Sequence, residues 1–173
     1  MSQIKVNSII PVSGVPTGGG GGIVQILTST KVDTFTTTSS TYADVSGLSV
    51  SITPTSTSNK IYIVVTVHNG GEGGSYCGYR VLRDSTIVTQ GTHATGNRSN
   101  VTFGGRIDQP YESMMNSFNF LDSPATTSAT TYKVQMSSLF ASRMVTLNRT
   151  NDDANETYSM SGTCTITVME VSA

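Results

Sequence analysis

The sequence predicts an all-β protein built around one jelly-roll β-sandwich. Apolar and polar residues alternate with a period of two along most of the chain, and turn-forming residues interrupt this alternation about every ten residues. The 173 residues include 24 serines and 27 threonines. Threonine favours strands, whereas serine and glycine favour turns. No segment shows the 3.6-residue period of an amphipathic helix, so we expect strands without helices.

The first half of the chain predicts four strands. Residues 23–35 open with alternating apolar side chains and are expected to form one long strand that bends near residues 28–30. A short strand follows at 42–45, and residues 48–52 alternate cleanly and stop before Pro54. Residues 60–68 are almost continuously apolar, which predicts a central strand covered on both faces. The glycine-rich run 69–74 predicts a loop.

The second half predicts a hairpin and several further strands. Residues 76–83 and 86–92 are expected to pair around a turn at Asp84-Ser85. Residues 93–112 are polar and weakly patterned, with one short strand at 101–103. Further strands are expected at 114–121, 131–139, 144–148 and 162–171, with an exposed loop at 151–156. The last strand alternates so regularly that it should pair centrally, and the alternation of long and tight connections favours a jelly roll.

The chain divides into an N-terminal segment, residues 1–22, and the jelly-roll domain, residues 23–173. Five consecutive glycines, residues 18–22, form a flexible joint that spans roughly 12 Å as a coil. The segment before them can add as a strand to the sheet edge of a partner or pack against its own copies. A disordered tail is the alternative. The candidate attachment residues are Ile4, Val6, Ile9, Ile10, Pro11 and Val12.

Composition argues against nucleic-acid binding and membrane insertion. Charged residues make up 12% of the chain, the formal net charge is −1, and no basic patch is visible. No segment reaches the ~18 apolar residues that a membrane span needs. A secretion signal is not expected, because Lys5 lies within the first apolar stretch and Pro11 ends that stretch. The chain is therefore expected to be made and kept in a cytoplasm.

Catalytic, cofactor and metal motifs are missing from the sequence, so we expect no enzyme and no cofactor. The two histidines, His68 and His93, are not joined to a nucleophile by any motif. Cys77 and Cys164 lack metal-ligand spacing, and Cys164 alternates in phase with inward-facing residues, which predicts a buried structural thiol. A pair of glycan-cleaving carboxylates stays open, because spatial pairing of acidic residues is not visible in a sequence.

Three polar connections are the candidate recognition surface: residues 69–76, 93–112 and 149–158. They combine backbone freedom with polar groups that hydrogen-bond sugars and aromatic rings that stack on them. The alternative is that they only connect strands. The acidic run at 152–156 lacks the spacing of a calcium loop, which favours a solvated turn. The candidate receptor-facing residues are Asn69, Glu72, Tyr76, Arg98, Arg106, Tyr111, Asp152, Asp153 and Tyr158.

Several phrases of the sequence resemble a known family. They are MSQIKVNSIIPVSGVP before the glycine run, LSVSITPTSTSNKI at 48–61, LRDST at 82–86, LDSP at 121–124 and TITVMEV at 165–171. In this order they resemble short tail-fibre and other virion structural proteins of marine bacteriophages, notably those of cyanobacteria. The resemblance covers essentially the whole chain. It departs from most fibres in lacking a long repetitive shaft.

The resemblance implies a virion structural protein that is assembled in the bacterial host cytoplasm. It implies an extended N-terminal anchor that binds other virion proteins and a C-terminal jelly roll that forms a homotrimer, similar in architecture to complement and tumour-necrosis-factor trimers. The function expected from it is a tail fibre that binds a host surface glycan or protein. The alternative is a capsid decoration or head-fibre protein with a purely structural role.

Overall fold

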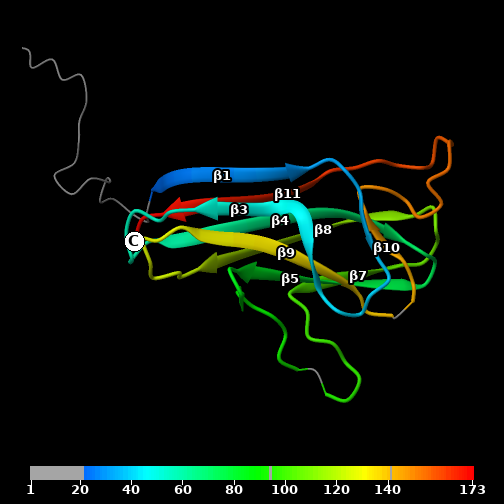
Figure 1. Ribbon diagram of the computed structural model, residues 1–173, viewed down its shortest axis with the longest axis horizontal. Helices are drawn as coiled ribbons and strands as arrows, with labels where there is room; N and C mark the ends of the chain where they lie inside the picture. Colours follow the sequence, from blue (N-terminus) through cyan, green and yellow to red (C-terminus); the bar gives the residue numbers. More distant parts are fainter. Residues whose placement is uncertain (1–21, 94, 141) are drawn as a thin grey trace, which may run out of the picture.

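The structure is a computed structural model that describes residues 22–93, 95–140 and 142–173. These residues form a sandwich of two antiparallel β-sheets with their strands along the long axis (Figure 1). The candidate attachment residues between Ile4 and Val12 lie outside the described residues.

The first sheet, sheet A, places the last strand of the chain near its centre. The order is β1 (Ile23–Lys31), β11 (Cys164–Val171), β4 (Lys60–Gly71) and β8 (Ser113–Asp122). Beyond the end of β11, the far end of β4 pairs with β10 (Val145–Leu147), which pairs with β2 (Phe35–Thr37). The expectation that the terminal strand pairs centrally is confirmed, because β11 lies between β1 and β4.

The second sheet, sheet B, completes the jelly roll. Its order is β3 (Ala43–Ile52), β9 (Thr130–Ser138) and β5 (Ser75–Arg83), and β5 also pairs with β6 (Thr86–Ile87) and β7 (Phe103–Ile107). The chain crosses repeatedly between the sheets, and every strand pair is antiparallel. This order confirms the predicted jelly-roll class, and no helix occurs among the described residues.

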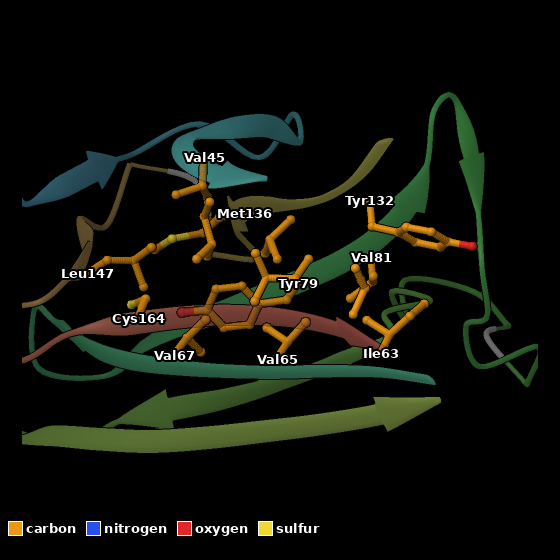
Figure 2. Close-up of a cluster of buried hydrophobic side chains, with 14 of the residues drawn as sticks. Val45, Ile63, Val65, Val67, Tyr79, Val81, Tyr132, Met136, Leu147 and Cys164 are labelled. Carbon is orange, nitrogen blue, oxygen red and sulfur yellow. The ribbon is translucent and has the colours of Figure 1, made fainter. Parts of the chain in front are cut away.

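The core lies between the sheets and follows directly from the period-two alternation. Along β4 every second side chain, from Ile61 to Val67, points inward and is fully buried. Figure 2 shows Ile63, Val65 and Val67 of this row next to Tyr79 and Val81 from sheet B. Each such side chain contributes about 1.5–3 kcal/mol to folding by leaving water.

Two strand boundaries in the first half differ from the prediction. The expected long strand 23–35 ends at Lys31 and resumes as β2 at Phe35, so the break lies after residues 28–30. The two short strands expected at 42–45 and 48–52 are one strand, β3, with an irregularity in its pairing to β9. Gly47 lies in that irregular stretch with a φ of 77°, a conformation that glycine adopts without strain.

The loop predicted at residues 69–74 is wrong for its first three residues. β4 continues through Asn69, Gly70 and Gly71, which pair with β10, while Asn69 and Gly70 also pair with β8. Glycine is favoured here by close packing, since a Cβ on Gly71 would lie 2.9 Å from the Met144 carbonyl oxygen. The glycines that predict a loop therefore mark a crowded strand end.

The outer face of β4 is only half-covered, which corrects the expectation that both faces are buried. Tyr62 lies on this face in register with Met169 of β11 and Leu121 of β8, and Met169 pairs with Ile26 of β1. These four residues form a continuous apolar row across sheet A, here called the outer stripe. Ile26 and Leu121 are 54% and 52% exposed.

Candidate functional site

Three connections meet at the end of the sandwich that lies away from the start of β1 and the C-terminus (Figure 1). They join β4 to β5, β7 to β8 and β10 to β11, and are here called the distal loop cluster. The N–H groups of Asn151 and Asp152 donate to the carbonyl oxygen of Pro110 at 2.9 and 3.2 Å. A Cβ on Gly73 would lie 2.9 Å from the Asp108 carbonyl oxygen. Two of the predicted recognition loops and the end of the third therefore form one surface.

Side chains hold the backbone of this cluster in place. Glu112 Oε2 accepts hydrogen bonds from the N–H groups of Asp108 and Gln109, both at 3.0 Å, and so closes the β7–β8 connection. Arg143 donates to the Gly73 carbonyl. Arg149 donates to the Asn151 carbonyl at 3.2 Å. The loops thus have a defined shape, which a binding surface needs.

Asn148, which sequence reasoning missed, fixes the start of the β10–β11 connection. Its Nδ2 donates to the carbonyl oxygens of Lys31 and Asp33 at 2.9 Å each, and its Oδ1 accepts from Cys164 Sγ at 3.0 Å. The residue is buried and has a φ of 63°, a left-handed conformation that asparagine tolerates better than most residues. An asparagine directly after a short apolar strand was the only available signal.

Two exposed aromatic rings lie side by side in the distal loop cluster. Tyr111 and Tyr158 meet edge to face, with ring centroids 6.4 Å apart, and they are 50% and 53% exposed. Rings in this state offer apolar faces and hydroxyl groups at the same place, which suits contact with sugars. Both were predicted as receptor-facing, and the structure brings them together from different connections.

The other predicted residues fall into separate places. Glu72 is half-exposed in the β4–β5 turn, and Asp152 and Asp153 are exposed, with Asp153 Oδ2 3.5 Å from Arg149 Nη1. Tyr76 and Arg106 form a cross-strand pair of β5 and β7, with the guanidinium carbon 5.5 Å from the ring centroid.

Two of the predicted residues do not belong to the distal surface. Asn69 was expected in an exposed loop, but it is a buried strand residue whose side-chain oxygen accepts from Asn116 Nδ2. Its side chain bonds to another side chain inside the protein, so the prediction that Asn69 faces a receptor is wrong. Arg98 is exposed but lies in the β6–β7 connection, which projects from a different side of the sandwich (Figure 1).

The cysteines and histidines form no catalytic arrangement in the described part of the chain. Cys77 and Cys164 are fully buried, and burial raises the pKa of both thiols. The prediction that Cys164 is a buried inward-facing thiol is confirmed. His68 is half-buried on β4, where desolvation lowers its pKa, and His93 is exposed in the β6–β7 connection. Within the described ranges, no group of three His, Cys, Asp or Glu residues is placed to hold a metal ion.

The opposite, proximal end is organised around Glu170 of β11. Its buried carboxylate accepts hydrogen bonds from Thr55 N, Thr55 Oγ1 and Asn59 Nδ2 at Oε1, and from Gln25 Nε2 at Oε2, at 2.6–2.8 Å. Burial opposes its ionisation, but these donors outweigh burial and lower its pKa to about 2. The carboxylate ties β1, β11 and the β3–β4 connection together where the chain enters the sandwich.

No family model and no curated protein matches the sequence. Among solved structures, a chain from the structure of infectious bursal disease virus Gx strain is similar at 12% sequence identity with a TM-score of 0.44. The similarity covers 98% of this chain and 42% of that chain, so this chain spans less than half the length of that neighbour. No helix in the described ranges is long and apolar enough to cross a membrane.

Proposed function

We propose that this chain is a structural protein of a bacteriophage virion, a short tail fibre that presents the distal loop cluster to the host surface. The observation that carries the proposal is that the two ends of the sandwich differ. The chain enters β1 at the end organised by Glu170, and the distal loop cluster lies at the other end (Figure 1). A protein attached through residues 1–22 would therefore hold these loops away from its attachment point.

The chemistry of the distal loop cluster favours a glycan as the ligand. Tyr111 and Tyr158 supply exposed ring faces, and Asp152 and Glu72 supply carboxylates in the same loop cluster. Sugar rings stack on aromatic faces while their hydroxyl groups bond to carboxylates and backbone amides. A host protein that offers hydroxyl groups and apolar patches in the same spacing is the other ligand class considered.

Association of three copies is part of the proposal and is supported by two apolar surfaces that differ in kind. The first is the outer stripe on sheet A. The second is the edge formed by β7 and β8, where half-buried Phe103, Phe118 and Phe120 continue a stack that begins at buried Tyr79, with successive ring centroids 4.7–6.3 Å apart. An edge that packs on a different face of the next copy generates a closed ring when the rotation between copies closes, and an open filament when it does not. We propose three copies because the resembled family implies a homotrimer.

Immunolabelling of purified particles tests the location. An antibody raised against residues 23–173 should mark the tail or its tip in electron micrographs of the virus that encodes this chain. Label spread over the head would replace the tail-fibre proposal by the capsid decoration or head-fibre alternative. Deletion of residues 1–15 should leave a folded oligomer that fails to enter particles, and normal incorporation of that variant would refute attachment through the N-terminal segment.

A further inference from the structure

A pocket of about 400 Å³ lies on the outer face of sheet B, and none of its lining residues belongs to the three connections of the distal loop cluster. The β2–β3 connection and the β6–β7 connection form its walls, and β5 forms its floor. Its lining consists of Ser40, Thr41, Tyr42, Arg80, Ser99, Asn100 and Leu139. Small hydroxyl groups and one guanidinium group dominate the lining, and no carboxylate belongs to it.

The floor of the pocket is built by a glycine that makes room for a tyrosine. A Cβ on Gly78 of β5 would lie 2.7 Å from Tyr42 Oη and 2.7 Å from Leu139 Cδ2. The missing side chain therefore allows Tyr42 to lie against the strand. Arg80, two residues further along the same face, places its guanidinium carbon 3.9 Å from the centroid of the Tyr42 ring. Stacking on the ring holds the guanidinium plane in one orientation.

Two polar atoms of the pocket are buried without a partner. Arg80 Nε and Tyr42 Oη are inaccessible to solvent, and neither forms a hydrogen bond within the described residues. Because solvent does not reach these two atoms, a ligand in the pocket does not contact them directly. The terminal nitrogens of the Arg80 guanidinium are not among the buried unpaired atoms, so they are the donors that a ligand can reach.

The charge of Arg80 is also uncompensated. Arg83, Arg106 and Arg149 each lie within 4 Å of a carboxylate, but Arg80 has no such partner in the described part of the chain. Asp44 is close in the sheet, because Gln135 pairs with it on one side and with Arg80 on the other. The Asp44 oxygens are occupied by Lys133 Nζ and Gln135 Nε2, both at 2.8 Å. The pocket thus presents a net positive charge.

We propose that this pocket binds the acidic sugar unit of a polysaccharide, with Arg80 as the anion-binding residue. A guanidinium group forms two parallel hydrogen bonds with a planar carboxylate, and its fixed orientation over Tyr42 favours this geometry. Ser40, Thr41 and Ser99 offer hydroxyl groups of the kind that pair with sugar hydroxyls. The volume suits one monosaccharide unit better than a folded partner. This site is additional to the distal loop cluster and requires no particular location in the virion.

The test measures binding of short oligosaccharides to the full chain by calorimetry and by NMR. Oligoglucuronate is the carboxylate probe, glucose 6-sulfate is the sulfate probe, and the uncharged maltotriose is the neutral control. We expect the acidic probes to bind at least tenfold more tightly than maltotriose and to shift the Arg80 Nε–H resonance. The acidic probe that binds more tightly identifies which anionic group the pocket prefers. Wild-type protein that binds neither acidic probe below 10 mM would overturn the proposal.

Matched variants separate the pocket from general charge effects. Arg80→Gln should weaken binding of the acidic probe at least tenfold, whereas Lys60→Gln removes a cation at the start of β4 in sheet A and should leave binding unchanged. Gly78→Ala should weaken binding by displacing Tyr42, with thermal melting used to show that each variant is folded. Equal losses in the Arg80 and Lys60 variants, or equal binding of short polyglutamate, would refute a saccharide site. These outcomes do not depend on particle labelling, so they are separable from the proposed function.

Discussion

Replacement of Glu170 by glutamine is expected to destabilise the protein by about 1–3 kcal/mol at pH 7. A glutamine side chain keeps one acceptor oxygen, which still accepts hydrogen bonds from Thr55 and Asn59. In place of the second oxygen, which lies 2.6 Å from Gln25 Nε2 in the wild type, it puts an amide N–H group. Gln25 cannot relieve the clash by rotating its amide, because the same nitrogen donates to the Thr53 carbonyl at 2.9 Å. One buried donor therefore stays unpaired.

The same carboxylate gives the stability a defined dependence on pH. The folded-state pKa of Glu170 is about 2, below its ordinary value of 4.5, so the unfolded state binds more protons between these values. Stability contributed by this group is complete above pH 4.5 and is lost as the pH falls towards 2. After allowance for solvent screening, we expect the loss to be about 1–2 kcal/mol.

Urea unfolding at pH 7 and pH 3 measures both effects. Tyrosine fluorescence is the natural probe, because the chain has seven tyrosines and no tryptophan. The difference in unfolding free energy between wild type and Glu170→Gln should shrink at pH 3. Glu156→Gln, in the exposed β10–β11 connection, is the matched control and should change stability by less than about 0.5 kcal/mol. A difference for Glu170→Gln that is below that value, or constant with pH, would refute the reasoning.

Three further predictions concern the loops and the association of copies. Asn148→Ala should lower the free energy of unfolding in urea by about 2–4 kcal/mol, because it removes three hydrogen bonds and forces alanine to a φ of 63°. Asn148→Gly should lower it by about 1 kcal/mol less, because glycine adopts this φ without strain. Equal losses in the two variants would contradict the role of the backbone conformation. Leu121→Lys should raise the dissociation constant of the oligomer about tenfold or more in sedimentation experiments, while Thr127→Lys, which is exposed outside both sheets, should not. Tyr111→Ala should reduce adsorption of particles to host cells without changing particle yield, and a fall in yield would point to a structural role.

Alternation of side chains was sufficient to predict the fold class and most of the core. β4, β9 and β11 each bury every second residue over much of their length, and no competing period occurs in these segments. Two of the boundaries that differ involve glycine, at Gly47 within β3 and at Gly70 and Gly71 at the end of β4. Gly70 and Gly71 were assigned to a loop because glycine favours turns, whereas their role is to admit neighbouring chain segments at the end of a strand.

The candidate sites were less predictable, because they depend on contacts between distant segments. The contact between Tyr111 and Tyr158 and the bonds from Asn151 and Asp152 to Pro110 join connections that are unrelated in sequence. The pocket around Arg80 was not predicted at all. Residue 42 reaches residue 80 only because β9 pairs with both β3 and β5, and no local pattern contains that information.

The two faces of the sandwich differ in a way that connects the proposals. The outer face of sheet A carries the outer stripe, which copies would bury, whereas the outer face of sheet B carries polar residues and the Arg80 pocket. Association of three copies through sheet A and the β7–β8 edge would leave three equivalent pockets exposed on one trimer.

Three exposed pockets predict avidity for a polymer. A single acidic sugar should bind the Leu121→Lys variant and the wild type equally, because the pocket itself is unchanged. An acidic polysaccharide that spans two pockets should bind the wild-type oligomer roughly 10²–10⁴-fold more tightly than the dissociated variant. Biolayer interferometry with immobilised polyglucuronate compares the two proteins directly. Equal affinity for the polymer would mean either that the copies do not associate through the outer stripe or that the pocket does not bind the chain, and the monosaccharide titration separates these two explanations.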